Sequence, residues 1–408
     1  MKGSCHKSPP KDEDSAPVTI GELMRQYSHR LQGLLPEQWS VVRAISRCRE
    51  ALMGWRKLKC KKCGEKVYLY RSCRNRHCPL CQGVARAKWV RDRLKELLPV
   101  PYFHVVFTLA GELRALALRN KKVMYDILFR ASSETLMEVS ERNLNARIGA
   151  LGILHTWGQQ MMDHPHIHFI VTGGGLSLDG LRWIFGKQKY FLPKDILSEV
   201  FQGKLLDYIG QAYRAGELIF PGQIEHLADP VKFAQLMRSV VQKRLVVHIK
   251  RPFGGPEQVL CYLGRYTHRV AITNERILKL ENEMVTFQYK DYADKNKVKT
   301  MELPVEAFLR RFLMHVLPER FKKIRMYGIW GNRAKKKLLP QCRDLIAKQK
   351  PAKMAEMLIA PGLEVREPEP TICPKCGGKD FEVIEDVTPR RFRRRERKNQ
   401  KGVDVNTS

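Results

Sequence analysis

The stretch His164-Pro165-His166-Ile167-His168-Phe169-Ile170-Val171-Thr172 combines alternating apolar residues with closely spaced histidines. Read as a β-strand, it sends successive side chains to opposite faces. His166 and His168 then share one face with Ile170, whereas Ile167 and Phe169 point to the other. Two imidazoles separated by one residue on a strand face can bind a single metal ion without any rearrangement of the backbone. The stretch therefore predicts a strand that carries a metal site.

The segments around this strand predict a mixed fold. Residues 102–109 are strongly β-prone, residues 113–143 have a helical pattern, and residues 148–157 read as a second strand. Strand, helix and antiparallel strand pair in this order are typical of an α+β domain. We expect the glycine triplet at 173–175 to be a turn, a hairpin at 277–292, and helices from 305 to 348.

The charge of the chain restricts its partners. Its 408 residues include 74 Lys and Arg against 42 Asp and Glu, a formal net charge of +32. A charge of this sign and size favours a polyanionic partner. The sequence has no run of 18 apolar residues, no apolar segment near its start and no phosphate-binding glycine loop. We therefore expect a cytoplasmic protein with no membrane partner and no nucleotide cofactor.

The cysteines predict zinc. Cys60-Lys61-Lys62-Cys63 and Cys78-Pro79-Leu80-Cys81 are two thiolate pairs with the spacing of a closed structural site. Cys73 and His77 lie between them, so an additional pair either serves a second ion with Cys48 or replaces one member of the set. The single pair of Cys373-Pro374-Lys375-Cys376 cannot close a site alone, and we expect it to be a remnant or an exposed knuckle.

Basic residues surround the predicted zinc site and continue into the next helix. They are expected to contact DNA phosphates. The alternative is a zinc site that only folds the region. The residues are Lys61, Lys62, Lys66, Arg71, Arg74, Arg76, Arg86 and Lys88.

A second chemical motif is Tyr262-Leu263-Gly264-Arg265-Tyr266-Thr267-His268-Arg269. On a helix that starts near Pro256, Tyr262 and Tyr266 stand one turn apart on the same face, flanked by Arg265 and Arg269. Such a pair is also typical of plain amphipathic packing. Together with a metal-binding strand, it predicts attack of a tyrosine oxygen on a DNA phosphate that the metal ion polarises and the arginines hold in line.

These motifs together resemble those of HUH endonucleases. More closely, residues 48–343 resemble the two-tyrosine rolling-circle transposases of insertion sequences, including the zinc-binding segment Ser72-Cys73-Arg74-Asn75-Arg76-His77-Cys78-Pro79-Leu80-Cys81. The resemblance implies nicking of single-stranded transposon ends, a 5′-phosphotyrosine intermediate and strand transfer, without a double-strand break. It further implies Mg²⁺ or Mn²⁺ at the histidines and structural Zn²⁺ at the cysteines.

The resemblance also assigns roles to individual residues. It makes His166 and His168 metal ligands, and Tyr262 and Tyr266 nucleophiles. Family members often have a histidine where this chain has Trp55, so the zinc ligand set departs from the family pattern there.

A third ligand for the catalytic ion is usual in such sites and commonly comes from the neighbouring strand. Gln159 is the expected ligand, because a tight hairpin would bring it across from His166. His155, Asp163 and His164 are its rivals.

The predicted architecture is α+β, with an antiparallel-sheet HUH nuclease domain between an N-terminal zinc-binding domain and a helical C-terminal segment. The expected divisions are a disordered leader at 1–18, a zinc-binding and DNA-binding domain at 19–100, a catalytic domain at 101–300, helices at 301–362 and a basic disordered tail at 363–408. Two other functions remain open at this point. They are a non-catalytic zinc protein that binds DNA, and a replication-initiation or mobilisation nuclease of the same fold.

Overall fold

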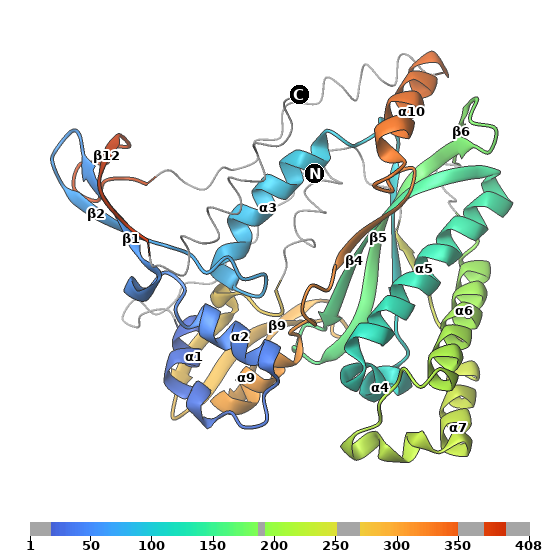
Figure 1. Ribbon diagram of the computed structural model, residues 1–408, viewed down its shortest axis with the longest axis horizontal. Helices are drawn as coiled ribbons and strands as arrows, with labels where there is room; N and C mark the ends of the chain where they lie inside the picture. Colours follow the sequence, from blue (N-terminus) through green and yellow to red (C-terminus); the bar gives the residue numbers. More distant parts are fainter. Residues whose placement is uncertain (1–17, 187–191, 251–269, 350–370, 389–408) are drawn as a thin grey trace.

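The computed structural model of the chain describes residues 18–186, 192–250, 270–349 and 371–388. Its main sheet is six-stranded and ordered β11-β4-β5-β3-β7, with β6 paired to β5. All of these pairings are antiparallel, so the α+β prediction is confirmed (Figure 1). The strands are β3 (Tyr102–Thr108), β4 (Ala146–Trp157), β5 (Asp163–Ser177), β6 (Trp183–Phe185), β7 (His248–Lys250) and β11 (Ile324–Gly328).

Strand β5 contains the histidine stretch and lies between β4 and β3. His166 lies opposite His155 on one side and opposite Thr108 on the other. The side chains of β5 alternate between the two faces of the sheet, as the sequence predicts. Ile167 and Phe169 pack into the core beneath the helices, whereas Ile170 belongs to a different core on the histidine face.

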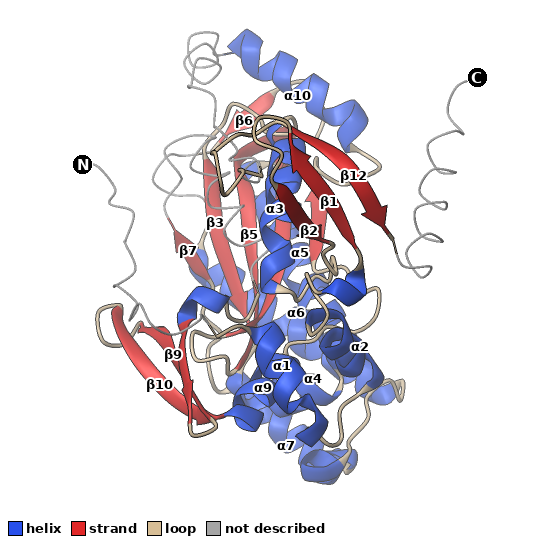
Figure 2. Cartoon of the chain, turned by 90° about the vertical axis from the view of Figure 1, so that its left-hand side faces the viewer, coloured by secondary structure: helices blue, strands red, loops and turns tan. Residues whose placement is uncertain are grey.

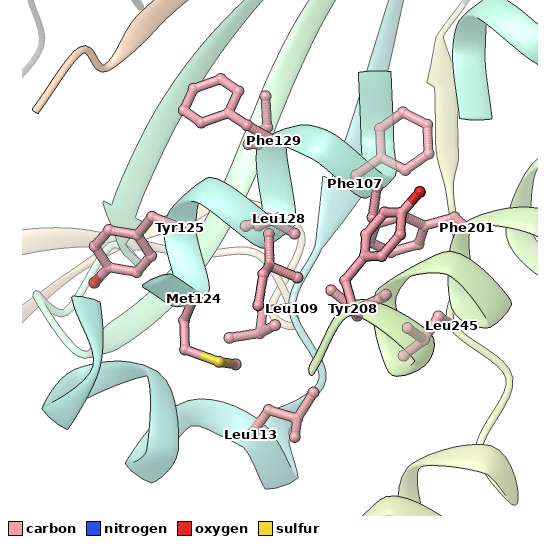
Figure 3. Close-up of a cluster of buried hydrophobic side chains, with 14 of the residues drawn as sticks. Phe107, Leu109, Leu113, Met124, Tyr125, Leu128, Phe129, Phe201, Tyr208 and Leu245 are labelled. Atoms are coloured by element: carbon pink, nitrogen blue, oxygen red, sulfur yellow. The ribbon is translucent and has the colours of Figure 1, made fainter. Parts of the chain in front are cut away.

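Helices α4 (Arg114–Arg119), α5 (Lys121–Leu144), α6 (Lys194–Arg214) and α7 (Pro230–Val241) form a layer beside the sheet (Figure 1). Helix α7 begins at a proline, where no backbone N–H is needed, and the Asp229 carboxylate accepts hydrogen bonds from the next two free N–H groups. The rings of Phe107 and Phe201 join sheet to helix, with centroids 4.9 Å apart (Figure 3). This core fixes the face of the sheet that is turned away from the histidines.

The histidine face is covered at one end by α3 (Pro79–Leu94) and α10 (Lys335–Gln349). Their core includes Tyr102 and Trp330, whose rings stack 5.7 Å apart. The other end of this face carries the histidines and remains accessible as a cavity.

The N-terminal helices share a core with residues far along the chain. Helices α1 (Ile20–Tyr27) and α2 (Pro36–Ile45) pack against α9 (Val305–Met314) and a sheet ordered β10-β9-β8. Its strands are β8 (Ile277–Glu281), β9 (Met284–Asp291) and β10 (Lys297–Pro304). The expected hairpin at 277–292 is therefore present as β8 and β9.

A separate three-stranded sheet pairs two strands from the first hundred residues with one strand from the last described segment. It is ordered β12-β1-β2, from β1 (Trp55–Cys60), β2 (Lys66–Tyr70) and β12 (Phe381–Val387). Figure 2 shows these three strands side by side.

Three sequence predictions about the fold are wrong. Residues 324–328 are strand β11, added to the edge of the main sheet, and not part of a helix. The glycine triplet at 173–175 is not a turn, because β5 continues through it to Ser177 while β4 and β6 pair alongside. The tail from 363 is not wholly disordered, since β12 is paired with β1. Among the described residues, no helix is both long and apolar enough to span a membrane.

Gly328 offers a test of the β11 edge. It has φ +60°, and an added Cβ would lie 1.8 Å from the carbonyl oxygen of Ile148. Because both backbones are held in the sheet, we expect Gly328→Ala to lower the free energy of unfolding by at least ~2 kcal/mol, as measured by denaturant titration. Gly203→Ala is the control: this helical glycine has open space around its Cβ position, so the change should stabilise by roughly 0.5–1 kcal/mol. Equal effects of the two substitutions would contradict the described packing.

Candidate active site and metal centres

Three histidines from β4 and β5 meet on the open end of the sheet. His155, His166 and His168 each offer a ring nitrogen, and these nitrogens all lie within 4.8 Å of one another. The two Nε2 atoms of His166 and His168 are 3.0 Å apart. The direct pairing of His155 with His166 across the β4–β5 hairpin brings the third ring to the pair.

Hydrogen bonds orient these rings. Nδ1 of His166 donates a hydrogen bond to the carbonyl oxygen of His164 at 2.6 Å. In a neutral ring, Nε2 then carries no proton, and its lone pair is available to a metal ion. Nδ1 of His168 lies 2.8 Å from Nε2 of His104, which is buried on β3. Burial lowers the pKa of His104 to about 3, with smaller contributions from Lys250 and His166. His104 is therefore neutral near pH 7, and its Nε2 can accept a hydrogen bond from the Nδ1–H group of His168.

The donor set fits a divalent metal ion. With its proton on Nδ1, His168 also turns the lone pair of Nε2 toward His166. Two imidazole nitrogens bound at right angles to an ion at about 2.1 Å are about 3.0 Å apart, which matches the observed separation. A histidine that binds a metal ion usually donates its other ring N–H to a neighbouring acceptor, as His166 does to the carbonyl oxygen of His164.

The structure places His155 beside His166 and His168, whereas Gln159, the expected third ligand, lies elsewhere in the wall of the same cavity. Strand β4 ends at Trp157, so Gln159 lies in the connecting turn, and its amide donates to the Tyr292 hydroxyl at 2.7 Å. The register of the β4–β5 hairpin places His155 next to the histidine pair, because His155 lies directly opposite His166. Counting back from the short turn at 158–162 would have identified it.

The other two rivals, His164 and Asp163, line the same cavity without joining the triad. Both oxygens of Asp163 are buried and have no hydrogen-bond partner among the described residues. Burial raises the pKa of Asp163 to about 6, although Lys121 and Arg114 oppose the shift. Asp163 is thus a carboxyl group that can exchange protons close to neutral pH.

The histidines form part of the wall of a cavity of about 900 Å³. Aromatic and cationic side chains occupy its other walls, namely Trp157, Tyr289, Tyr292, Arg114, Arg244, Lys250, Arg276 and Lys290. The stacking of Trp157 on His155, with centroids 4.9 Å apart, joins the aromatic wall to the triad. Stacking surfaces beside positive charge suit a nucleic-acid strand whose bases are unpaired.

The first cysteine cluster consists of Cys48, Cys73, Cys78 and Cys81. Cys48 lies after α2, and Cys78 and Cys81 lie at the start of α3. The sulfur of Cys48 is 3.5 Å from that of Cys81 and 3.6 Å from that of Cys78. Sulfurs around a tetrahedral Zn²⁺ with bonds of about 2.3 Å are about 3.8 Å apart, so the cluster fits zinc.

The predicted grouping of Cys60 and Cys63 with Cys78 and Cys81 is wrong. Cys60 and Cys63 lie with Cys373 and Cys376 in a second cluster, so the C-terminal pair is neither a remnant nor an isolated knuckle. The prediction from sequence spacing grouped cysteines that are close in the sequence. In the structure, the two pairs of this cluster are more than 300 residues apart in the sequence.

His77 is not a zinc ligand either. Its ring is half-buried, and its Nε2 accepts a hydrogen bond from the backbone N–H of Leu317 at 3.5 Å. Burial lowers its pKa well below the ordinary value for histidine. Trp55 opens β1 opposite Tyr70 and Val387, and both cysteine clusters have four ligands without a histidine at that position.

The predicted DNA-contacting residues divide into distinct groups. Arg76 turns inward and donates to the carbonyl oxygens of Phe321 and Pro318 at 2.6 and 2.7 Å, so the structure gives it a packing role and not a phosphate contact. Lys61 and Arg71 pair with acidic residues of the β12 segment. Lys62, Lys66 and Arg74 are exposed, and Lys61 is exposed as well although it is paired.

Several predicted site residues fall outside the description. Tyr262, Arg265, Tyr266 and Arg269 lie in the segment 251–269, outside the described residues. Arg86 and Lys88 lie on α3, and their side chains are also outside the description.

Comparison with known proteins identifies the class. Residues 149–337 match a family described as "Putative transposase", and residues 19–109 match one described as "Transposase zinc-binding domain". The chain is 44% identical over 339 residues to "Putative transposase y4qJ" of Sinorhizobium fredii (strain NBRC 101917 / NGR234), covering 82% of this chain and 85% of that protein. It is 26% identical over 361 residues to the transposase for insertion sequence element IS801 of Pseudomonas savastanoi pv. phaseolicola, covering 86% and 85%. No solved structure matches it.

The antiparallel sheet, the cysteine clusters and these matches define a transposase with an N-terminal zinc-binding domain, which acts on DNA. The chain belongs to the transposase family of the IS91 and IS801 insertion sequences. The resemblance seen in the sequence motifs is thereby confirmed at the level of the family.

A buried histidine beside the site gives a pH-dependent prediction. His315 donates through Nε2 to the carbonyl of Met161 at 3.0 Å, and Nδ1 pairs with the Thr156 hydroxyl at 3.2 Å. Burial lowers its pKa from 6.5 to about 4. The unfolded state therefore takes up a proton first as the pH falls, and stability is lost between pH 6.5 and 4, by up to ~3 kcal/mol.

We expect His315→Gln to flatten the dependence of unfolding free energy on pH between 7 and 4, as measured by urea titration. The control is His226→Gln, which removes a histidine that is exposed in the folded state. An unchanged slope in His315→Gln would show that this histidine is not neutral in the folded state.

Proposed function

We propose that this transposase nicks single-stranded transposon ends by tyrosine attack and then transfers the strand. The observation that carries the proposal is the imidazole triad of His155, His166 and His168 in the wall of a cavity rich in aromatic and cationic side chains. The family assignment favours transposition over replication initiation or mobilisation.

The three histidines would hold Mg²⁺ or Mn²⁺. Such an ion, when bound, polarises the scissile phosphate and stabilises the charge that develops on it. His104 acts behind the triad, because its contact with Nδ1 of His168 keeps the other nitrogen of that ring directed at the site.

The nucleophile in this proposal is Tyr266 or Tyr262. The described residues on both sides of segment 251–269 support it. Lys250 lines the same cavity as the triad, and Val270 borders a small cavity together with Trp157, which stacks on His155. Tyr266 precedes Val270 by four residues, and four residues of chain span at most ~14 Å.

In the proposed step, the phenol oxygen forms a bond to phosphorus, and the bond from phosphorus to the 3′-oxygen breaks. The 5′ end of the strand becomes attached to the tyrosine. The phenol releases its proton to solvent, and the leaving 3′-oxygen takes up a proton from solvent and ends as a hydroxyl. Arg265 and Arg269 would hold the phosphate oxygens in line. A second tyrosine allows one phenol to hold the donor strand while the other attacks the next junction.

The walls of the cavity support an unpaired strand as the substrate. Trp157, Tyr289 and Tyr292 offer ring faces for unstacked bases. Lys290 and Arg276 line the same cavity as Tyr289 and Tyr292. Base stacking on such rings contributes about 1–3 kcal/mol per base.

We further propose that the first cysteine cluster binds a structural Zn²⁺. Cys48 follows α2, and Cys78 and Cys81 lie at the N-terminus of α3. One ion on these sulfurs would fix the start of the long helix against the N-terminal helices. Its four thiolates leave no open position for a substrate, so its role is architectural.

Formation of a covalent adduct tests the proposed reaction. Single-stranded terminus DNA labelled at its 3′ end, incubated with the protein and Mn²⁺, should give a protein–DNA species that resists SDS. Tyr262→Phe with Tyr266→Phe should abolish it, because no phenol oxygen remains to attack. Tyr213→Phe is the matched control, since its hydroxyl donates to Ala228 within the helical layer. An undiminished adduct in the double variant, or none in the wild type, would refute tyrosine nicking.

Titration with Mn²⁺ tests the ligand set separately from catalysis. His155→Ala should weaken Mn²⁺ binding by ~10-fold or more, because it removes one of three donors. Gln159→Ala should bind Mn²⁺ like the wild type, since the Gln159 amide is engaged by Tyr292. Calorimetric titration measures both, and the reverse order of effects would replace His155 by Gln159 as the ligand.

A further inference from the structure

The two cysteine pairs Cys60/Cys63 and Cys373/Cys376 meet at one end of the β12-β1-β2 sheet. We propose that these four thiolates bind a second Zn²⁺, separate from the ion at the first cluster. Half of its ligands lie beyond residue 337, outside both segments that match the transposase families. The site would make the C-terminal part of the chain a component of the zinc-binding region.

The sulfur positions suit one ion. The sulfurs of Cys60 and Cys376 are 3.6 Å apart, and those of Cys63 and Cys373 are 3.5 Å apart. All four lie within 4.8 Å of one another. A disulfide would need about 2.0 Å, whereas the edges of a tetrahedral Zn²⁺ site are about 3.8 Å.

The two pairs also have the same backbone structure. The N–H of Gly64 donates to the carbonyl of Cys60 at 2.8 Å, and the N–H of Gly377 donates to the carbonyl of Cys373 at 2.9 Å. Each first cysteine then donates its own N–H to the carbonyl five residues later, both at 2.8 Å. Two turns that are unrelated in position have thus adopted one geometry, in which both sulfurs of each pair face the other pair.

Glycines make these turns possible. Gly64 and Gly377 have φ of +76° and +69°, a region that residues with a Cβ rarely adopt. At Gly378, an added Cβ would lie 3.3 Å from the sulfur of Cys376 and 3.4 Å from that of Cys60. The chain therefore has no side chain where it passes closest to the sulfurs.

The sheet lacks a core that would hold it together otherwise. Of the 18 residues in β1, β2 and β12, only Leu58 and Cys60 are buried. Tyr68, Tyr70 and Val383 are about half exposed. A three-stranded sheet needs an apolar face or another constraint to be stable in water. A metal ion bound by both halves supplies that constraint, because the free energy of metal binding becomes free energy of folding.

Charge complementarity supports the same pairing. Arg56 contacts Asp386 at 2.9 Å, and Lys61 contacts Asp380 at 3.2 Å. Residues 55–71 contain seven cationic side chains and one acidic, whereas residues 380–386 contain four acidic side chains and no cation. Exposed ion pairs contribute little stability each, but their arrangement selects this strand as the partner of β1.

Zinc analysis of the purified full-length protein tests the site. We expect the wild type to hold about two zinc ions on cysteine, and Cys373→Ser with Cys376→Ser to hold about one fewer. Cys60→Ser with Cys63→Ser should lose the same ion, and the quadruple variant should lose no more than either pair alone. Cys342→Ser is the control, because Cys342 is buried in another core and belongs to neither cluster.

An unchanged zinc content in Cys373→Ser with Cys376→Ser would overturn the proposal. So would a quadruple variant that loses twice the zinc of each pair. Hydrogen exchange guards against general unfolding: in both pair variants the amides of β12 should lose protection while those of β5 keep it. Because neither readout requires DNA cleavage, failure of this site and failure of the proposed nicking reaction are distinguishable.

Discussion

The pairing of β5 between β4 and β3 is the constraint on which the site depends. It places His155 directly across from His166, and it brings His104 from β3 within 2.8 Å of His168. The opposite face of β5 is fixed by Phe169 in the helical core. A slip of one residue in this register would turn the histidines into that apolar core. Packing on one face therefore determines the chemistry available on the other.

The sequence predicted those parts of the molecule that depend on local pattern. Alternation gave the two faces of β5, and the spacing of cysteines gave zinc as the metal. The third histidine required the hairpin register, which the pattern at 148–157 alone did not set. Strand β11 resembled its helical neighbours in composition, and only its edge position beside β4 makes it a strand. The grouping of Cys60 with Cys376 could not be predicted from sequence spacing, because 316 positions separate the two residues.

The hydrophobic cores are distributed unevenly over the described parts of this chain. The main sheet rests on a large apolar core with buried phenylalanines, and the N-terminal helices share another core with α9 and β9. The β12-β1-β2 sheet has almost none. Its basic hairpin is also partly neutralised by Asp386 and Asp380. The net positive charge of this sheet is consequently lower than the sequence of the hairpin alone suggests.

The β12-β1-β2 sheet cannot form until late in synthesis, because β12 is translated long after β1 and β2. Cys63 leaves the ribosome 310 residues before Cys373. At about 5–20 residues per second, this interval lasts roughly 15 to 60 s. During it, the first hairpin has neither its third strand nor its remaining sulfurs. A copy of the gene interrupted between codons 168 and 373 would thus leave the hairpin unfinished, even though every residue of the histidine triad is present.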